Sequence, residues 1–101
     1  MPLDMAPYVA SKHGVIGLTK AAGREYAKRG IRINAVWPGA IRTPLNQEMP
    51  GEMVKPILDL HPIGRLGRPG EVAEAAVWLC SDAAFFITGT TLLIDGGYTA
   101  M

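Results

Sequence analysis

Tyr8 and Lys12 are the residues of this chain whose types and spacing best suit chemistry. They stand four residues apart, so on a helix their side chains lie side by side on one face. A neighbouring ammonium group stabilises the phenolate form of tyrosine, which brings the phenol closer to acid–base work at neutral pH. Tyrosine and lysine also meet at this spacing by chance on many helices, so the spacing alone leaves a structural role open.

The other reactive side chains carry weaker signals. His13 turns away from the Tyr8 face of a helix, and His61 lies in a loop, so the two histidines lack the spacing of metal ligands and no metal site is predicted. Cys80 has apolar neighbours and is expected to pack as a small apolar side chain. Asp95 ends a predicted strand and is expected to accept hydrogen bonds in a turn.

The composition excludes several classes of function. The 101 residues include ten Lys+Arg against nine Asp+Glu, a formal net charge of +1, and the basic residues are scattered, so we expect no nucleic-acid partner. The longest apolar run, residues 75–80, is far shorter than the roughly 20 residues that span a bilayer, so no membrane association is expected. The single cysteine cannot form an internal disulfide, and a cytoplasmic location is the default expectation.

The element that must position Tyr8 and Lys12 is a long helix. Helix-forming residues without internal proline predict it from Pro7 to about Arg29, with Gly30 as the stop. Its glycines each disfavour a helix by up to about 1 kcal/mol relative to alanine, so a neighbouring segment is expected to approach their bare backbone closely. These glycines are Gly14, Gly17 and Gly23.

The rest of the chain alternates strands and helices. Residues 31–37 are rich in β-branched side chains and predict a strand that Pro38-Gly39 ends, and residues 90–95 predict a second, buried strand. Between them we expect a weaker helix at about 52–60, interrupted or kinked at its proline, and a helix at about 69–80. This order predicts an α/β fold with a parallel sheet, about two strands and three helices.

Two strands leave the edges of such a sheet open, and the first helix carries apolar residues on two faces. The chain supplies too few other elements to cover these surfaces. We therefore expect residues 1–101 to be a single partial domain that needs a further half, either from another chain or from a longer protein.

Three segments, taken in their order and spacing, carry a family resemblance. They read YVASKHG at residues 8–14, RINAVWPG at residues 32–39 and GTTLLIDGG at residues 89–97. Through them the chain resembles the short-chain dehydrogenase/reductase family over its whole length. The resemblance implies that the chain is the C-terminal half of a doubly wound, Rossmann-like oxidoreductase. Such an enzyme interconverts a secondary alcohol and a ketone by hydride transfer with NAD or NADP, and its substrate is a small alcohol or carbonyl compound.

The resemblance also implies roles for individual residues. Tyr8 would be the general acid/base, and Lys12 would bind the nicotinamide ribose while favouring the phenolate of Tyr8.

In the loop that follows the first strand, the resemblance assigns residues to the cofactor. Pro38 and Gly39 would abut the nicotinamide, the backbone of Ile41 would hold its carboxamide, and Thr43 would bond to its amide or phosphates. Without the resemblance, the proline and glycine would simply turn the chain.

Residues 45–61 resemble the family's variable substrate lid. Four apolar residues there would line a pocket or plug one: Met49, Met53, Leu58 and Leu60.

The chain departs from the family pattern at its N-terminal end. Only seven residues precede Tyr8, so neither the Gly-rich turn for the pyrophosphate nor the serine about a dozen residues before the tyrosine has a counterpart. Ser11 lies about 100° around the helix from Lys12 and cannot replace that serine. We therefore expect weak or absent dinucleotide binding and no activity from the chain alone, with a second copy or a complementary N-terminal half as partner. The alternative is a non-enzymatic assembly module, because the first helix and the last helix and strand resemble the family's oligomer interfaces.

Overall fold

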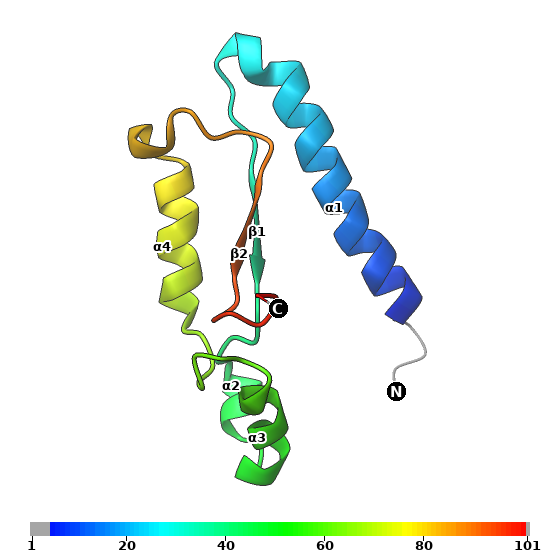
Figure 1. Cartoon of the computed structure of the whole chain (residues 1–101), viewed down its shortest axis with the longest axis vertical. Coiled ribbons are helices and arrows are strands. Elements are labelled where there is room, and N and C mark those ends of the chain that lie inside the picture. The colour runs from blue at the N-terminus through cyan, green and yellow to red at the C-terminus, as the bar shows by residue number, and fades with distance from the viewer. Residues whose placement is uncertain (1–4, 101) are drawn as a thin grey trace. The chain divides into compact units, whose positions relative to one another are not determined.

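The computed structural model describes residues 5–100 of the chain (Figure 1). In chain order, its elements are the helix α1 (Met5–Tyr26), the 3₁₀ turn η1 (Ala27–Arg29), the strand β1 (Ala35–Pro38), the helices α2 (Pro44–Gln47), α3 (Gly51–Asp59) and α4 (Pro69–Leu79), the 3₁₀ turn η2 (Asp82–Ala84) and the strand β2 (Thr91–Ile94). The predicted alternation of helices and strands is confirmed, with α2 as a short addition. The fold class is therefore α/β.

The strands β1 and β2 pair in a two-stranded sheet. The Ala35 amide donates to the Thr90 carbonyl at 2.9 Å, and the Gly39 amide donates to the Ile94 carbonyl at 2.9 Å. The paired positions advance in the same direction along both strands, so the sheet is parallel. The helices α2, α3 and α4 occur in the connection between the two strands, which makes this part of the chain a βαβ unit.

Close backbone contacts divide the chain into two units, and each strand contributes residues to both. Unit 1 contains α1, η1, the segment up to Ala35, and Leu79–Leu92. Unit 2 contains Val36–Trp78 and the residues that follow Leu92. The helices α2 and α3 and nearly all of α4 therefore belong to unit 2.

In unit 1, the predicted stop at Gly30 is confirmed, but α1 itself ends at Tyr26, three residues before the predicted Arg29. The 3₁₀ turn η1 follows it, and Gly30 has a left-handed backbone with φ of 76°. The expected close approach is found at Gly23, where an added Cβ would lie 2.7 Å from the Cα of Gly89. At Gly14 and Gly17 the described residues bring nothing within 4 Å, so the expectation is wrong there for this part of the chain.

The first strand is shorter than the prediction, because side chains bond the residues before it. The Ile33 amide donates to the Thr88 hydroxyl at 3.0 Å, in place of a carbonyl on a neighbouring strand. The amide group of Asn34 donates to the Ile87 carbonyl at 3.0 Å, and its oxygen accepts from the Thr90 amide at 3.1 Å. Regular strand pairing therefore begins only at Ala35.

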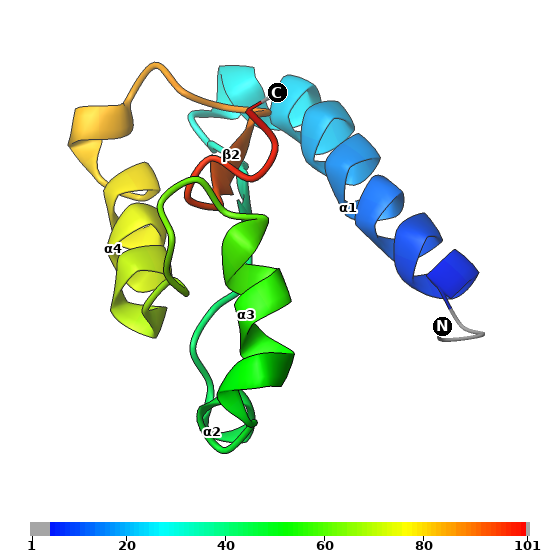
Figure 2. The ribbon, with the colours of Figure 1, turned by 60° about the horizontal axis from the view of Figure 1, so that its bottom comes forward.

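In unit 2, α2 and α3 lie next to each other in both ribbon views (Figure 2). Reciprocal hydrogen bonds between Thr43 and Asn46 begin α2: the Thr43 amide donates to Asn46 Oδ1 at 2.8 Å, and the Asn46 amide donates to Thr43 Oγ1 at 3.2 Å. Pro44 occupies the first helical position, where a missing N–H is harmless. The helix α3 continues through Pro56, so an interruption there is wrong, and the predicted kink stays a prediction.

Few side chains of the described residues are buried. The buried apolar residues are Leu79 and Ala84. On α1, Val15 and Leu18 remain 53% and 69% exposed, as expected for a chain with too few elements to cover them. Cys80 is exposed and not packed as predicted, because α4 ends at Leu79 and the chain turns there. None of the described helices is both long and apolar enough to span a membrane.

Candidate functional site

The helix α1 places Tyr8 and Lys12 beside each other. The Nζ atom of Lys12 lies 5.5 Å from the centre of the Tyr8 ring, within the range of a cation–π contact. Tyr8 is 55% exposed. His13 bonds instead to the Val9 carbonyl one turn earlier, at 2.9 Å. This part of α1 therefore offers a phenol and an ammonium group together on an accessible helix face.

The residues predicted to contact the cofactor's nicotinamide end lie together in unit 2, in the loop of residues 38–43, here called the β1 loop. A short parallel bridge joins Ile41 to Gly67. In this bridge the Arg42 amide donates to the Gly67 carbonyl at 2.7 Å, and the Gly67 amide donates to the Ala40 carbonyl at 2.9 Å. The bridge uses neither the N–H nor the C=O of Ile41. The backbone of the β1 loop is thus fixed while the peptide groups of Ile41 serve other partners.

Glycine at position 39 permits a close approach of two backbone segments. A Cβ atom there would lie 2.9 Å from both Cα and Cβ of Asp95, and 3.0 Å from Nε2 of His61. Carbon atoms in ordinary contact stay about 3.5–4.0 Å apart. The β1 loop therefore occupies its place against Asp95 and His61 only because Gly39 has no side chain.

Thr43 ends the β1 loop and begins α2. Its hydroxyl oxygen accepts the Asn46 amide, and the side-chain amide of Asn46 donates to the Ile41 carbonyl at 2.7 Å. A hydroxyl group that accepts one hydrogen bond still has its own proton to donate. Thr43 is also exposed, so this proton can reach a ligand.

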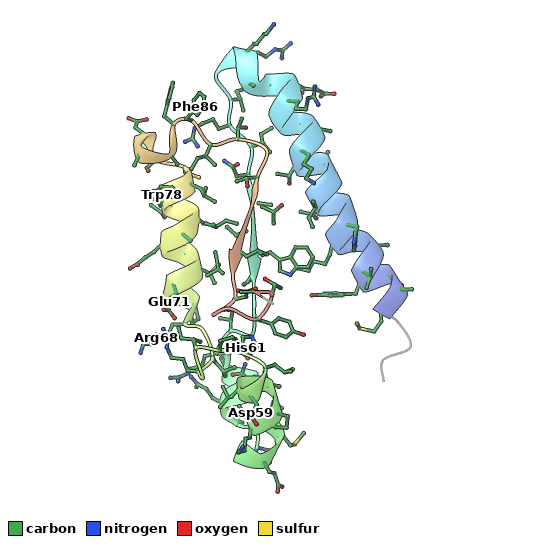
Figure 3. The ribbon with its side chains drawn as sticks, viewed as in Figure 1. Asp59, His61, Arg68, Glu71, Trp78 and Phe86 are labelled. Atoms are coloured by element: carbon green, nitrogen blue, oxygen red, sulfur yellow. The ribbon has the colours of Figure 1, made fainter. Side chains whose placement is uncertain are left out.

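No sequence motif assigns a role to His61. It follows the last turn of α3 and is buried, with 7% of its surface exposed (Figure 3). Its Nδ1 lies 2.8 Å from the Ile57 carbonyl, and its Nε2 accepts the Ala40 amide at 3.3 Å. Its ring stacks on Tyr98, with centres 5.1 Å apart and planes 21° apart. Its backbone-bonded partners lie 4 and 21 residues away, so no short motif reveals this contact set.

An ion pair between Arg65 and Glu71 stabilises the loop that contains Gly67, which bonds to the β1 loop. The Arg65 guanidinium makes two bonds to the Glu71 carboxylate, at 2.8 and 2.9 Å, and the Arg68 amide donates to the same carboxylate at 2.8 Å. Arg68 and Glu71 lie at the start of α4 (Figure 3). The hydrogen bonds from Arg65 lower the pKa of Glu71 to about 2. Gly67 lies between Arg65 and Glu71 in the chain, so their ion pair also stabilises the bridge from Gly67 to Ile41.

Asp95 is a turn acceptor, as the sequence predicts. Its carboxylate accepts the Thr99 hydroxyl at 2.7 Å, the Thr99 amide at 3.2 Å and the Gly97 amide at 3.1 Å. The Thr99 hydroxyl contributes most to lowering the pKa of this carboxyl group below its usual value. Asp95 therefore remains charged and fixes the turn after β2.

The predicted lid residues separate into two groups. Met49 and Leu58 line an open groove of about 370 Å³ together with Arg42 and Asn46. Met53 and Leu60 are exposed. Only part of the predicted apolar set therefore faces a common space in unit 2.

A model of the family described as enoyl-(acyl carrier protein) reductase matches residues 3–99. The chain belongs to the short-chain dehydrogenase/reductase family. Among its relatives in this family, cyclohexanol dehydrogenase of Acinetobacter sp. (strain SE19) is 57% identical over 98 residues, which cover 96% of this chain and 38% of that enzyme. The 3-oxoacyl-(acyl-carrier-protein) reductase of Thermotoga maritima is 47% identical over 90 residues, covering 89% of this chain and 37% of that enzyme.

A solved member of the family has the same fold. It is a protein of Agrobacterium tumefaciens assigned as a 2-deoxy-d-gluconate 3-dehydrogenase, with bound NADP. It is 43% identical, superposes with a TM-score of 0.86, and the match covers 93% of this chain and 39% of that protein. The chain thus spans less than two-fifths of the length of each of these three family members.

Proposed function

We propose that this chain supplies the acid/base tyrosine, its lysine and the nicotinamide-side loop of an NAD(P)-dependent oxidoreductase that interconverts a secondary alcohol and a ketone. The observation that carries the proposal is the placement of Tyr8 and Lys12 on one accessible face of α1, with 5.5 Å between the Lys12 ammonium nitrogen and the Tyr8 ring centre. The named activities of its relatives, which are dehydrogenases and reductases, support the reaction class.

The residues of the β1 loop fit the nicotinamide end of a dinucleotide. Gly39 lets the end of β1 pack closely against Asp95 and His61, and Pro38 precedes it with a fixed backbone angle. The Gly67 bridge leaves the Ile41 N–H unused, and the Ile41 carbonyl, which accepts the Asn46 side-chain amide, has a second lone pair, so the two groups suit a carboxamide, which is both donor and acceptor. The Thr43 hydroxyl retains a proton for the cofactor's amide or phosphate oxygen. When bound, the nicotinamide supplies or accepts the hydride.

Tyr8 performs the proton transfer in this proposal. In alcohol oxidation its phenolate takes the hydroxyl proton while the hydride leaves the carbinol carbon. In ketone reduction its phenol returns that proton to the carbonyl oxygen as a hydride adds to the carbonyl carbon. In this role the Lys12 ammonium group would favour the phenolate and would hold the ribose hydroxyls of the bound dinucleotide. A proton moved by a positioned side chain accelerates such a step by about 10²–10⁴-fold.

We propose that activity also requires segments beyond these 101 residues. The seven residues before Tyr8 contain neither a Gly-rich turn nor the serine expected about a dozen residues before the tyrosine. A complementary N-terminal half would supply both and would cover the exposed apolar residues of α1. The domain proposed for residues 1–101 is thus the C-terminal half of a Rossmann-like fold.

The test joins this chain to the N-terminal region of the Acinetobacter cyclohexanol dehydrogenase that precedes the aligned segment. Oxidation of secondary alcohols is then followed by the absorbance of the reduced nicotinamide. We expect turnover from the fusion and a loss of about 10²–10⁴-fold on Tyr8→Phe.

Tyr26→Phe is the matched control for this test. Tyr26 lies on the same helix and also faces a cation, with the Arg29 guanidinium 5.4 Å from its ring centre, yet it has no proposed role. It should retain normal turnover. If Tyr8→Phe keeps activity within about tenfold of the parent fusion, Tyr8 is not the acid/base.

A second candidate function is that of a non-enzymatic assembly module. The exposed apolar side chains of unit 1 favour it, above all Phe86, which is 98% exposed, and Leu18. The module would form stable oligomers of this chain and would remain inactive when fused to a complementary half. Turnover by the fusion therefore favours the oxidoreductase, and an inactive fusion with a dilution-resistant oligomer of the chain favours the module.

A further inference from the structure

His61 joins three separate segments of unit 2. It follows α3 and reaches the Ile57 carbonyl in that helix, the Ala40 amide in the β1 loop, and the Tyr98 ring after β2. Only 7% of its surface is exposed, so little water competes for these contacts. A buried side chain with a partner on each ring nitrogen holds those partners in a fixed geometry.

The partners of His61 define its protonation state. A carbonyl oxygen only accepts, so Nδ1 must carry the proton that points at Ile57. A backbone N–H only donates, so Nε2 must offer a lone pair to Ala40. The ring is therefore neutral with its proton on Nδ1. Protonation at Nε2 would set two donors against each other and break the contact with Ala40.

The contact with Ala40 acts on the residues that flank it. The Ala40 amide is held by His61 at 3.3 Å, and the Ala40 carbonyl is held by the Gly67 amide at 2.9 Å. The His61 bond therefore fixes the Gly39–Ala40 peptide plane, and the Gly67 bond fixes the Ala40–Ile41 peptide plane, which carries the Ile41 N–H. Gly39 and Ile41 are the positions proposed to meet the nicotinamide and its carboxamide, although His61 itself is assigned no ligand contact.

We propose that neutral His61 is a positioning residue for the β1 loop: by accepting the Ala40 N–H, it holds the Gly39–Ala40 peptide, and together with the Gly67 bond to the Ala40 carbonyl it sets the orientation in which the next peptide receives the nicotinamide carboxamide. This inference rests on the proposed function of the loop. It predicts that His61 affects cofactor binding more than the proton transfer, and that its effect disappears when the ring takes up a second proton.

The charged and titratable neighbours of His61 are already engaged with other groups. Arg65, Glu71 and Asp95 line the same cavity of about 70 Å³, Tyr98 stacks on the ring, and on α3 Lys55 lies 3.3 Å from Asp59. Within the described residues, Arg65 is paired with Glu71, and Asp95 is bonded to Gly97 and Thr99. The Ala40 contact therefore depends on the protonation of His61 itself.

Amide exchange in the full 101-residue chain tests the contact without any cofactor. The variants are His61→Phe, which keeps an aromatic ring against Tyr98 but has no acceptor, and His61→Gln, whose side-chain oxygen can accept from Ala40. His13→Gln is the control, because His13 is exposed on α1. We expect Ala40 exchange to rise about fivefold in His61→Phe, to recover in His61→Gln and to be unchanged in His13→Gln. Equal Ala40 protection in His61→Phe and the parent chain would overturn the proposal.

If His61→Phe fails to fold, two other measurements on the parent and His61→Gln chains decide the matter. Nitrogen NMR of the parent chain must show the ring proton on Nδ1, and the opposite tautomer would overturn the inference. When the pH is lowered, the protection of the Ala40 amide, corrected for the intrinsic pH dependence of exchange, must be lost with the same midpoint as the ring's own protonation. In His61→Gln this pH dependence must vanish, and its persistence would refute the role of the ring.

Kinetics of the fusion enzyme separate positioning from general structural support. In the soluble fraction of His61→Phe, we expect KM for the dinucleotide to rise about fivefold with kcat nearly unchanged, and His61→Gln to restore it. A fall in kcat that accompanies the rise in KM and that His61→Gln does not rescue would indicate structural damage and overturn the positioning role. If the parent fusion is inactive but its Ala40 amide is protected from exchange, the proposed function is refuted. The contact by which His61 fixes the β1 loop would still be supported.

Discussion

Because Gly39 has no side chain, its neighbours lie very close to it. We therefore expect even the smallest enlargement, Gly39→Ala, to lower the free energy of unfolding. The new Cβ would lie 2.9 Å from two carbon atoms of Asp95, and ordinary carbon contacts begin at about 3.5 Å, so the segments must part by about 0.6 Å. One of the two atoms is the Asp95 Cα, which cannot turn aside as a flexible side chain does. The movement therefore strains the backbone pairing at the end of β1.

The size of this loss in stability can be estimated from the packing and the hydrogen bonds around Gly39. Overpacking of a tight site costs about 1–3 kcal/mol, and alanine returns only about 0.4–1 kcal/mol by restricting the unfolded chain. The Gly39 amide also bonds to Ile94 at 2.9 Å, and the Ala40 amide bonds to His61 at 3.3 Å, so a shift of the loop weakens both. We expect a net loss of about 1–3 kcal/mol in the free energy of unfolding.

Urea unfolding of the 101-residue chain measures this loss as a lower midpoint at an unchanged slope. Gly14→Ala is the control, because nothing among the described residues lies within 4 Å of its added Cβ and it stands inside α1. That variant should gain up to about 1 kcal/mol. If Gly39→Ala is as stable as the parent chain while Gly14→Ala gains stability, the close approach at Gly39 is not real and the reasoning is refuted.

Two further predictions concern charge and cofactor. The Arg65 hydrogen bonds lower the pKa of Glu71 from 4.5 to about 2, so the stabilisation from this pair is full above about pH 4.5 and is lost as the pH falls towards 2. Acid unfolding of the chain should lose this pH dependence in Glu71→Gln, and an unchanged acid profile would contradict it. Calorimetry of the unfused chain with NADP should give a dissociation constant weaker than about 10 μM, because the pyrophosphate seat is outside these residues; tighter binding, equivalent to more than roughly 7 kcal/mol, would contradict this.

Local signals predicted the elements well. The long helix and its stop follow from residues that act on their immediate neighbours, and Gly30 in its left-handed conformation is such a signal. The start of β1 was placed four residues too early, at Ile31, because the pattern of β-branched residues does not reveal that Thr88 and Thr90 bond to the residues before Ala35. Those partners are more than fifty residues away in the sequence.

Contacts between residues far apart in the sequence account for the other differences between the sequence-based predictions and the structure. The sequence interpretation gave Cys80 a packed position on the strength of its apolar neighbours, yet the turn after Leu79 exposes it. It gave His61 no role, because its bond to Ala40 joins two loops that share no spacing pattern. The pairing of Tyr8 with Lys12 was predictable because helix geometry alone sets it.

Asn34 determines how the two strands align. Its side chain both donates to Ile87 and accepts from Thr90, so it reproduces the paired donor and acceptor of a backbone peptide one step before the sheet begins. A slip of β1 by one residue would reverse every side chain of the strand and would also leave this amide without both partners. The Asn34 side chain, which lies just before β1, therefore favours one register of the two strands. An aspartate at this position would lack the N–H donor that bonds to the Ile87 carbonyl.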